Sequence, residues 1–307
     1  MKTILITGSS GFIGKNLIKS LIENKFDIFT PSSSDFDLTK EKDVDKLFKL
    51  KEFHSVIHLA ADVGGIKMIR ANHGRIFYNN VMMNTLLMEK SRINNVKNFI
   101  SLNTINCYPE NDKTLNETQI WDGFPNTETF SYGIAKRTIL AQSLAYKEQY
   151  DFNSINLIID NTYGPFDNFD LKNSRVIPAL INKIYDAVQN NKPVVDVWGS
   201  GKSIRQFLYV GDLIEIIKLI LINDLNNDTI NISNGETVSI KNLVENISSI
   251  LNYKGKINYD TTKPEGAAAR LMENKRMNEV LKYDNFDFIN EGLKKTIDWY
   301  ISNDTDS

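Results

Sequence analysis

The sequence predicts an α/β fold, with a doubly wound parallel sheet followed by a smaller α/β domain. Short β-branched runs alternate with helical spacing of apolar residues through residues 1–165, which is typical of parallel strands joined by right-handed crossovers. A glycine-rich turn directly follows the first of these runs. The length of 307 residues suits two domains of roughly 150 residues each. We therefore expect domains over 1–165 and 166–307, with part of about 206–233 returning to the first.

Five apolar runs in the first domain have the composition of buried strands. They cover residues 3–7, 27–29, 55–60, 98–102 and 154–159. The segments between them carry apolar residues three and four positions apart, which predicts helices near 13–21, 44–48, 79–93 and 131–150. Strands and helices therefore alternate in the order that a doubly wound sheet requires.

The character of the sequence changes after Tyr163-Gly164-Pro165. Residues 167–174 are polar and predict a loop, residues 176–189 predict a helix, and residues 194–198 predict a strand. No stretch rich in proline, glycine or serine separates the two halves, so we expect them to interleave.

The composition argues against several classes of protein. Lysine and arginine total 36 and aspartate and glutamate 38, so the net charge of −2 lacks the basic excess of a nucleic-acid binder. One cysteine forms no internal disulfide, and three scattered histidines with one cysteine make a poor metal site. No apolar run approaches the roughly 18 residues of a membrane span, and no leader-like segment is visible. We expect a cytoplasmic protein with no membrane, metal or nucleic-acid partner.

The turn after the first strand has glycines at positions 8, 11 and 14. In this context the first glycine permits the tight turn, the second lets the backbone approach a pyrophosphate, and the third lets helix and strand pack closely. The N-terminus of the following helix then faces the phosphates. The motif therefore predicts a Rossmann-type dinucleotide site.

The choice of cofactor depends on the end of the second strand. Binders of NAD tend to place a carboxylate there for the ribose 2′-hydroxyl, but this chain has Thr30-Pro31 and then serines, among them Ser32 and Ser33. Hydroxyls and backbone N–H groups can accept a 2′-phosphate, with Lys15 or another cation nearby, which favours NADP(H). Asp37 follows closely and weakens that preference, although it can instead contact the adenine.

Tyr132 and Lys136 stand four residues apart on the helix near 131–150, hence on one face. An ammonium near a phenol lowers the pKa of the phenol, so the tyrosine can exchange a proton with a sugar alcohol or ketone. Thr104 ends the fourth strand, where its hydroxyl can bind a substrate carbonyl. The spacing alone also fits two exposed residues on a helix.

These residues together resemble the extended short-chain dehydrogenases/reductases, and within them the GDP-L-fucose synthase branch. That branch consists of NADPH-dependent epimerase–reductases of a GDP-4-keto-6-deoxy sugar. The matching segments span nearly the whole chain: residues 60–66, 132–136, 161–165, 167–169, 173–180, 198–201, 205–208 and 263–266.

The resemblance implies a role for each matching residue. Thr104, Tyr132 and Lys136 take the places of the reductase triad. Positions implied to bind the cofactor are Gly8, Ser10, Gly11, Phe12, Ile13, Gly14, Ser32, Ser33, Asp37, Leu38, Leu59, Ala60, Ala61, Asn80, Tyr132, Lys136 and Asn161. Positions implied to bind the nucleotide sugar are Val63, Gly64, Asn106, Arg175, Val176, Leu180, Trp198, Arg205, Lys263 and Arg270, with Arg205 on the diphosphate.

The chain departs from the branch at the two residues used for epimerisation. The family has a cysteine two positions after the triad hydroxyl residue and a histidine before the Val-Ile-Pro segment, where this chain has Asn106 and Arg175. Asparagine does not titrate, and arginine stays protonated. Cys107 is one position away and is expected to face the other side, although a slipped loop can bring it in.

The resulting hypothesis is an NADPH-dependent C4 ketoreductase of a GDP-linked 4-keto hexose or heptose in bacterial surface-polysaccharide synthesis. Any C3 or C5 epimerisation then belongs to a separate enzyme. A bifunctional GDP-L-fucose synthase and an NAD-dependent nucleotide-sugar 4-epimerase stay open as alternatives, as does a non-enzymatic dinucleotide sensor on the same fold.

The helices near 79–93 and 131–150 carry apolar residues beyond what one sheet face needs. In similar enzymes this helix pair forms a four-helix dimer interface. We therefore expect a homodimer, with Met83, Leu140 and Leu144 as candidate contacts, although core packing explains them nearly as well.

Overall fold

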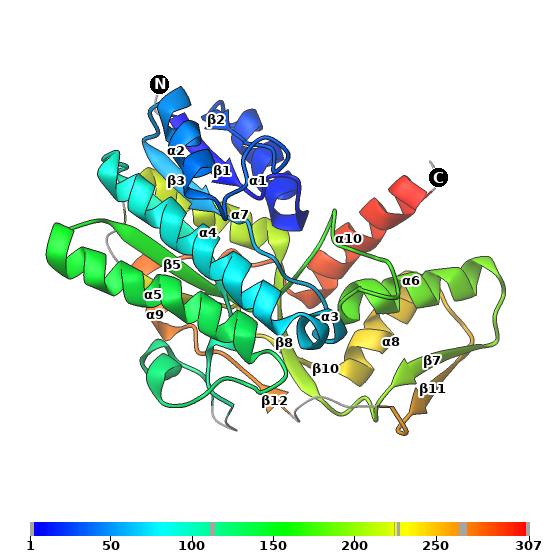
Figure 1. Cartoon of the computed structure of the whole chain (residues 1–307). Coiled ribbons are helices and arrows are strands. Elements are labelled where there is room, and N and C mark those ends of the chain that lie inside the picture. Colours follow the sequence, from blue (N-terminus) through cyan, green and yellow to red (C-terminus); the bar gives the residue numbers. More distant parts are fainter. Residues whose placement is uncertain (1–2, 111–113, 224, 226–227, 264–268, 305–307) are drawn as a thin grey trace.

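The computed structural model describes residues 3–110, 114–223, 225, 228–263 and 269–304. A six-stranded parallel sheet has the order β2-β1-β3-β4-β5-β9 (Figure 1). The strand order reverses between β1 and β3, which is where open α/β sheets bind ligands at the carboxyl ends of their strands. The α/β, Rossmann-type prediction is confirmed. The strands are β1 (Thr3–Thr7), β2 (Asp27–Phe29), β3 (Ser55–His58), β4 (Asn98–Thr104), β5 (Ser154–Ile159) and β9 (Asp228–Ile232).

Alternate residues of β1 face opposite layers of helices. Ile4 and Ile6 belong to the core cluster that contains Leu17 and Leu21, whereas Leu5 belongs to the other cluster. This alternation follows from the two-residue period of a strand. One face is covered by α1 (Phe12–Glu23) and α7 (Val210–Asn223), and the other by α2 (Glu41–Leu50), α4 (His73–Ile93) and α5 (Phe130–Tyr150), with α3 (Ile66–Ala71) leading into α4 (Figure 1).

The second half of the chain forms two smaller sheets beside the carboxyl edge of the large one. In the first, β8 (Ile204–Tyr209) pairs with β6 (Asn161–Tyr163), β10 (Thr237–Ser239) and β12 (Ala269–Arg270). In the second, β7 (Val194–Trp198) pairs with β11 (Lys256–Asp260). The helices of this half are α6 (Val176–Gln189), α8 (Ile240–Ile250), α9 (Lys275–Leu281) and α10 (Ile289–Asp304), and the short 3₁₀ turns η1 (Ile105–Cys107) and η2 (Glu117–Trp121) follow β4.

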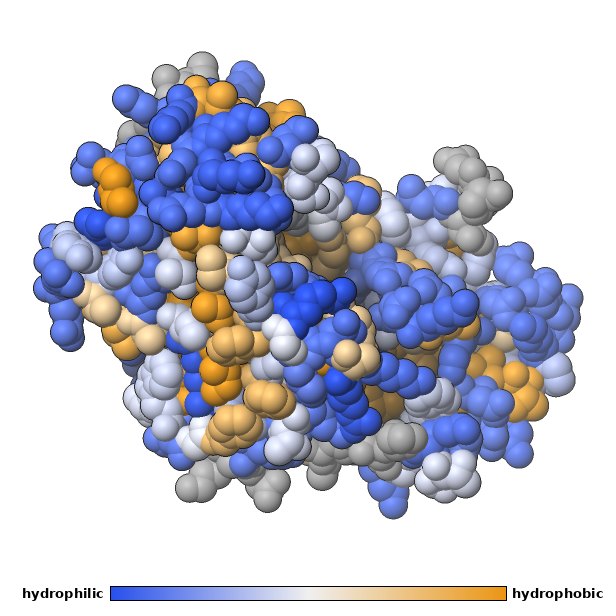
Figure 2. All heavy atoms as spheres, viewed as in Figure 1, coloured by the Kyte–Doolittle hydropathy of each residue, from blue (hydrophilic) through white to orange (hydrophobic). Residues whose placement is uncertain are grey.

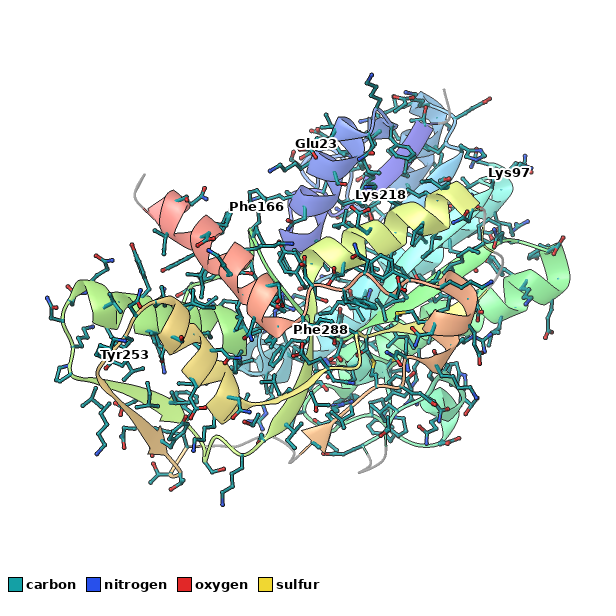
Figure 3. All side chains as sticks on the ribbon, turned by 180° about the vertical axis from the view of Figure 1, so that it is seen from behind. Glu23, Lys97, Phe166, Lys218, Tyr253 and Phe288 are labelled. Carbon is teal, nitrogen blue, oxygen red and sulfur yellow. The ribbon has the colours of Figure 1, made fainter. Side chains whose placement is uncertain are left out.

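Aromatic contacts tie this half to the helix after the glycine turn. Phe166 packs on Trp299 of α10 with ring centres 4.9 Å apart, and Lys15 of α1 lies 5.8 Å from the centre of the Phe166 ring. Seen from behind, Phe166 lies between α10 and α1 (Figure 3).

The expected start of one helix was wrong. Helix α4 begins at His73 rather than near residue 79, because Ile76 and Asn80, one turn apart, are both buried. His73 therefore belongs to a helix and not to a loop. Strand β4 extends beyond the apolar run 98–102 and ends at Thr104, where the sequence placed that residue. Among the described residues, no helix has the length and hydropathy needed to cross a membrane.

Candidate active site

The glycine turn between β1 and α1 is too tight for other residues at two positions. Gly8 has a φ of +70°, and a Cβ there would lie 2.6 Å from the Ala60 nitrogen. A Cβ at Gly14 would lie 2.4 Å from the Gly8 oxygen. Gly11 precedes α1 with its N–H donating to the Gly8 oxygen at 3.1 Å. Backbone donors at a helix N-terminus therefore face the space above the turn, which suits a pyrophosphate.

A cavity of about 340 Å³ opens between this turn and the loop after β2. It brings together seven of the residues predicted to bind the cofactor, and within the described part of the chain no lysine or arginine lines it. Lys15 instead lies against Phe166, so it is not the cation expected beside Ser32 and Ser33. The lining residues are Thr7, Gly8, Ser9, Ser10, Thr30, Pro31, Ser32, Ser33, Phe36, Asp37, Leu38, Ala60 and Met83.

The Asp37 carboxylate lies at the edge of this cavity and is already bonded to Thr39 and Lys40. Its Oδ1 accepts from the N–H and hydroxyl of Thr39 at 3.0 and 2.6 Å, and Lys40 lies 3.0 Å from Oδ2. The Thr39 hydroxyl and Lys40 lower the pKa of Asp37 to about 2. The carboxylate holds the turn that follows the serines.

A buried chain of hydrogen bonds runs beneath the cavity from β1 to α5. Burial lowers the pKa of His58 to about 3, so its imidazole is neutral. The Thr7 hydroxyl lies 2.8 Å from Nδ1 of His58, and Nε2 of His58 lies 3.0 Å from the side-chain oxygen of Asn84. The side-chain amide nitrogen of Asn84 donates to the Ala135 oxygen at 3.2 Å. Ala60 N–H donates to the Thr7 hydroxyl at 3.3 Å. His58 is thus a core histidine with both ring nitrogens bonded, and it links β1 and the segment after β3 to α5.

Asn80 was expected to bind the cofactor, and in this structure its side chain is engaged with the protein's own backbone. Its side chain is fully buried, and its amide nitrogen donates to the carbonyl oxygens of Asp62 and Ile76 at 2.8 and 2.7 Å. Its oxygen accepts from the Asp62 N–H at 3.1 Å. Asn80 therefore fixes the backbone of the segment after β3, and its side chain has no exposed surface.

Tyr132 and Lys136 lie on one face of α5, beside the end of β4 as predicted. Lys136 is buried, and its Nζ donates to the Leu102 oxygen at 2.7 Å while lying 5.9 Å from the centre of the Tyr132 ring. Burial lowers the pKa of Lys136 to about 8. Thr104 Oγ1 accepts from the Asn106 N–H at 3.3 Å, which leaves the hydroxyl proton of Thr104 able to donate.

The expected effect of Lys136 on Tyr132 is not seen in this arrangement. Burial raises the pKa of Tyr132 above its usual value, and the cation that lowers it is Arg175. The ammonium of Lys136 is directed at the Leu102 carbonyl, which accounts for its weak influence on the phenol.

Arg175 joins the cofactor turn to the second half of the chain. Its Nη2 lies 3.0 Å from Oδ1 of Asp167, whose side chain is only 5 % exposed. Its guanidinium lies 5.3 Å from the centre of the Phe12 ring. Arg175 occupies the position where the resemblance implies a histidine. It is a permanently charged group, it is paired with Asp167, and its charge lowers the pKa of Tyr132.

Cys107 faces the core. The side chain is fully buried in the cluster with Tyr108 and Leu115, and burial raises the pKa of its thiol to about 12. Asn106, one residue earlier, is half-buried. Cys107 therefore points away from Asn106 as expected, although the reason differs, because both residues lie in the 3₁₀ turn η1 and not in an extended segment.

Arg205 and Arg270 lie side by side at the far end of the site. Strands β8 and β12 pair in parallel with these two residues opposite each other. Nη2 of Arg270 donates to the Ile105 oxygen at 2.9 Å, and Nη1 of Arg205 donates to the Ile204 oxygen at 2.7 Å. Burial lowers the pKa of Arg270, and the positive charge of Arg205 adds to this effect. Two adjacent guanidinium groups suit an anion with more than one phosphate.

The other expected substrate positions divide into exposed and buried side chains. Leu180 is 4 % exposed and packs within the main core. Trp198 is 54 % exposed with Lys183 Nζ 5.8 Å from its ring, and so is not a core residue. Also exposed are the expected substrate positions Val63, Gly64, Val176 and Lys263. Among the expected cofactor positions, the half-buried residues are Ile13, Leu59, Ala61 and Asn161. Residues 264–266 of the matching segment lie outside the described residues.

One buried acid near the site was missed from the sequence. Asp160 directly follows β5, is 4 % exposed, and accepts hydrogen bonds from Asn161 and Ser233. The signal was present, since a carboxylate immediately after an apolar strand lies at the sheet edge that binds ligands.

Comparison with known proteins agrees with this geometry. The model of the NAD dependent epimerase/dehydratase family matches residues 4–233. The GDP-L-colitose synthase of Yersinia pseudotuberculosis is 32% identical over 304 residues, covering 97% of this chain and 98% of that protein. The GDP-L-fucose synthase of Dictyostelium discoideum is 33% identical over 312 residues, covering 98% and 96%.

Solved structures are similar over the same length. A GDP-mannoheptose C4 reductase from Campylobacter jejuni with NADP bound is 27% identical, with a TM-score of 0.88 and 98% of each chain covered. A GDP-6-OMe-4-keto-L-xylo-heptose reductase from the same organism is 26% identical, with a TM-score of 0.88 and 98% of each chain covered. The resemblance to the GDP-L-fucose synthase branch is thereby confirmed, and the chain belongs to the NAD dependent epimerase/dehydratase family.

Proposed function

We propose that this protein is an NADPH-dependent reductase that converts the C4 ketone of a GDP-linked 4-keto hexose or heptose to an alcohol. The observation that carries the proposal is the placement of Thr104, Tyr132 and Lys136 at the carboxyl edge of the sheet, beside the glycine turn. Support comes from the Campylobacter reductases and from the Yersinia and Dictyostelium synthases, because the name of each of these proteins contains a GDP sugar.

The cofactor cavity fits a dinucleotide, because only glycine leaves room at positions 8 and 14 for the backbone to cradle a pyrophosphate. When bound there, NADPH supplies a hydride. The hydroxyls of Ser32 and Ser33 at the cavity edge are the groups we assign to the 2′-phosphate. Asp37 stays turned to Thr39 and Lys40.

The protein's own residues supply the proton and the orientation of the ketone. Burial raises the pKa of Tyr132, so the phenol keeps its proton at neutral pH and can donate it to the carbonyl oxygen. The Thr104 hydroxyl donates a hydrogen bond to the same oxygen. The positive charge of Arg175 stabilises the phenolate that remains after the transfer, and Lys136 holds the tyrosine's helix against β4 through the Leu102 oxygen.

We propose further that the chain reduces without epimerising. Removing a proton next to a ketone needs a base, and the family positions for this chemistry hold an amide, Asn106, and a guanidinium, Arg175, that is paired with Asp167. The Cys107 thiol is buried with a raised pKa. A separate enzyme would then supply the correctly configured keto sugar.

The two arginines of β8 and β12 are assigned to the diphosphate of the substrate. Arg205 and Arg270 offer charged, planar donors on adjacent strands. The exposed faces of Val176 and Trp198 are assigned to the guanine and its surroundings.

The helices α4 and α5 are proposed to form a dimer interface. Figure 2 shows hydrophobic side chains gathered over these helices. Leu144 is 53 % exposed on α5 and is a suitable contact, whereas Leu140, also expected there, is 2 % exposed and belongs to the core. Met83 is half-buried and packs against the core. A cytoplasmic location and a role in bacterial surface polysaccharides stay predictions from the sequence.

A turnover screen tests the proposal. The purified protein is incubated with NADPH and GDP-4-keto sugars of different chain length, and product configuration at C4 is read by NMR. We expect NADPH consumption matched by C4 reduction. Tightly held NAD together with redox-neutral inversion at C4 would instead identify a 4-epimerase, and absence of any turnover would contradict both.

A further inference from the structure

Asp160 is held in a closed network at the carboxyl edge of the sheet. Its Oδ1 accepts from the N–H of Asn161 at 2.7 Å and from the side-chain amide of Asn161 at 3.0 Å. Its Oδ2 accepts from the Ser233 hydroxyl at 3.2 Å. The same Asn161 amide donates to the Gln206 oxygen at 3.2 Å. The carboxyl group thus fixes the start of β6 against β8, the strand that carries Arg205.

The network lies directly behind the candidate site. Ile159, the residue before Asp160, pairs in register with Thr104 of β4. Arg270 reaches from β12 to the oxygen of Ile105, the residue after Thr104. Gln206 in turn fixes β12, because its Oε1 accepts from the Met272 N–H at 2.6 Å. Asp160 is therefore linked by contacts to both arginine-bearing strands.

The charges around Asp160 are few. Arg270 of β12 is a charge that acts on Asp160, and the contacts from β6 and from the segment after β9 are the neutral Asn161 and Ser233. Arg270 itself faces Arg205, Glu110 and the Cys107 thiol, whose pKa is raised to about 12.

Burial raises the pKa of Asp160 to about 7, against the opposing effect of its hydrogen bonds and Arg270. The carboxyl group is therefore the member of this set that changes charge near neutral pH, since the arginines stay protonated and the thiol stays neutral.

We propose that Asp160 is a positioning residue for the diphosphate site, which orders Asn161 and provides a titratable countercharge behind Arg205 and Arg270. This rests on the proposed function, in which the two arginines bind the diphosphate. When Asp160 is neutral, the arginine pair presents its full positive charge to an anionic ligand. When Asp160 ionises, its negative charge offsets part of that field, so the affinity for the diphosphate falls as pH rises through neutrality.

Calorimetric titration of the full chain with GDP-mannose tests this inference. The diphosphate of this probe is a diester, so its charge is constant between about pH 6 and about pH 8.5. For the unmodified protein, we expect the dissociation constant to increase roughly fivefold over this range. Asp160→Asn keeps an oxygen to accept from Asn161 but has no charge to gain, so its dissociation constant should be nearly independent of pH.

Asp212 of α7 provides a matched control. Burial also raises the pKa of Asp212 to about 7, but its partners are Tyr283 and the Asp287 N–H, at the back of the molecule beside Phe288 (Figure 3). Asp212→Asn should keep the pH dependence of the unmodified protein.

An Asp160→Asn protein that still shows the fivefold change would overturn the inference while leaving the proposed function intact. If GDP-mannose does not bind at any pH while NADPH still binds, the proposed substrate class fails, and the inference fails with it. Should Asp160→Asn not fold, Ser233→Ala serves instead. Losing the hydroxyl that stabilises the carboxylate should move the midpoint to higher pH, and an unmoved midpoint contradicts the inference.

Discussion

Lys136 Nζ donates to the backbone oxygen of Leu102 at 2.7 Å and lies 5.9 Å from the centre of the Tyr132 ring. The lysine thus ties α5 to β4 and holds the tyrosine and Thr104 on neighbouring elements. No carboxylate in the described part of the chain pairs with this buried ammonium, and burial lowers the pKa of Lys136 to about 8. The arrangement makes the proton chemistry of the site sensitive to pH.

Replacing Lys136 with methionine should remove that sensitivity. In the unmodified protein, reduction should slow above about pH 8, because Lys136 loses its charge and with it the strong charged hydrogen bond to the Leu102 oxygen that holds Tyr132 in place. Methionine fills a similar buried volume without a charge, so the variant should be slower by about 100-fold with no change of slope near that pH. Steady-state rates of NADPH oxidation across pH check this, and an unchanged alkaline decline in the variant would assign the titration to another group.

Tyr132→Phe should abolish reduction and leave NADPH binding nearly intact. The phenyl ring keeps the packing on Ile69 and Ile76, so only the hydroxyl is lost. We expect kcat to fall by at least about 1,000-fold, within the range of a lost general acid. NADPH fluorescence titration is the control for folding and cofactor binding. Turnover close to that of the unmodified protein would show that another group donates the proton.

Arg205→Lys should weaken binding of the GDP sugar and spare the cofactor. Lysine keeps the charge but loses the planar pair of donors that suits a diphosphate, so we expect KM to increase by about tenfold with little change in kcat. Lys202→Arg, at an exposed position in the preceding turn, is a control that retains a cation. Equal KM values for the Arg205 variant and the unmodified protein would remove Arg205 from the diphosphate site.

The stability of the protein should depend on pH through Asp212. Its pKa is raised to about 7 in the folded state, so the unfolded chain releases this proton at lower pH and the free energy of unfolding falls as pH rises from about 4 to 7. Asp212→Asn should therefore be more stable than the unmodified protein at about pH 8, by on the order of 3 kcal/mol, and similar at about pH 4. Urea unfolding at both pH values checks the sign. Greater stabilisation at the acid end would contradict it.

Local spacing was sufficient to predict the parts of the site that lie on one element. The glycines of the turn and the Tyr132–Lys136 pair sit within one strand-turn-helix and one helix, so sequence distance fixes their relation. Asn80 and Leu180 were assigned to ligand binding by resemblance alone. In the structure, the Asn80 side chain bonds the Asp62 backbone, and the Leu180 side chain packs in the core. Position within a family does not reveal which atoms a neighbouring segment already occupies.

Relations between distant segments were beyond the reach of the sequence. The facing of Arg205 and Arg270 requires the parallel pairing of β8 with β12, which are far apart in the chain. The chain of hydrogen bonds through His58 and Asn84 requires β3 and α4 to meet. Burial also reversed the expected pKa shift of Tyr132, because desolvation of the phenol outweighs the nearby cations.

We propose that this protein reduces a keto sugar without moving protons at the neighbouring carbons. The most direct measurement is mass spectrometry of the product formed in D2O from NADPH and a GDP-4-keto sugar, with enzyme-free exchange subtracted. Asn106→Cys combined with Arg175→His restores the family's titratable pair and should gain deuterium at C3 or C5. For the unmodified protein we expect a product with no added deuterium at either carbon. Deuterium there at the rate of reduction would contradict it.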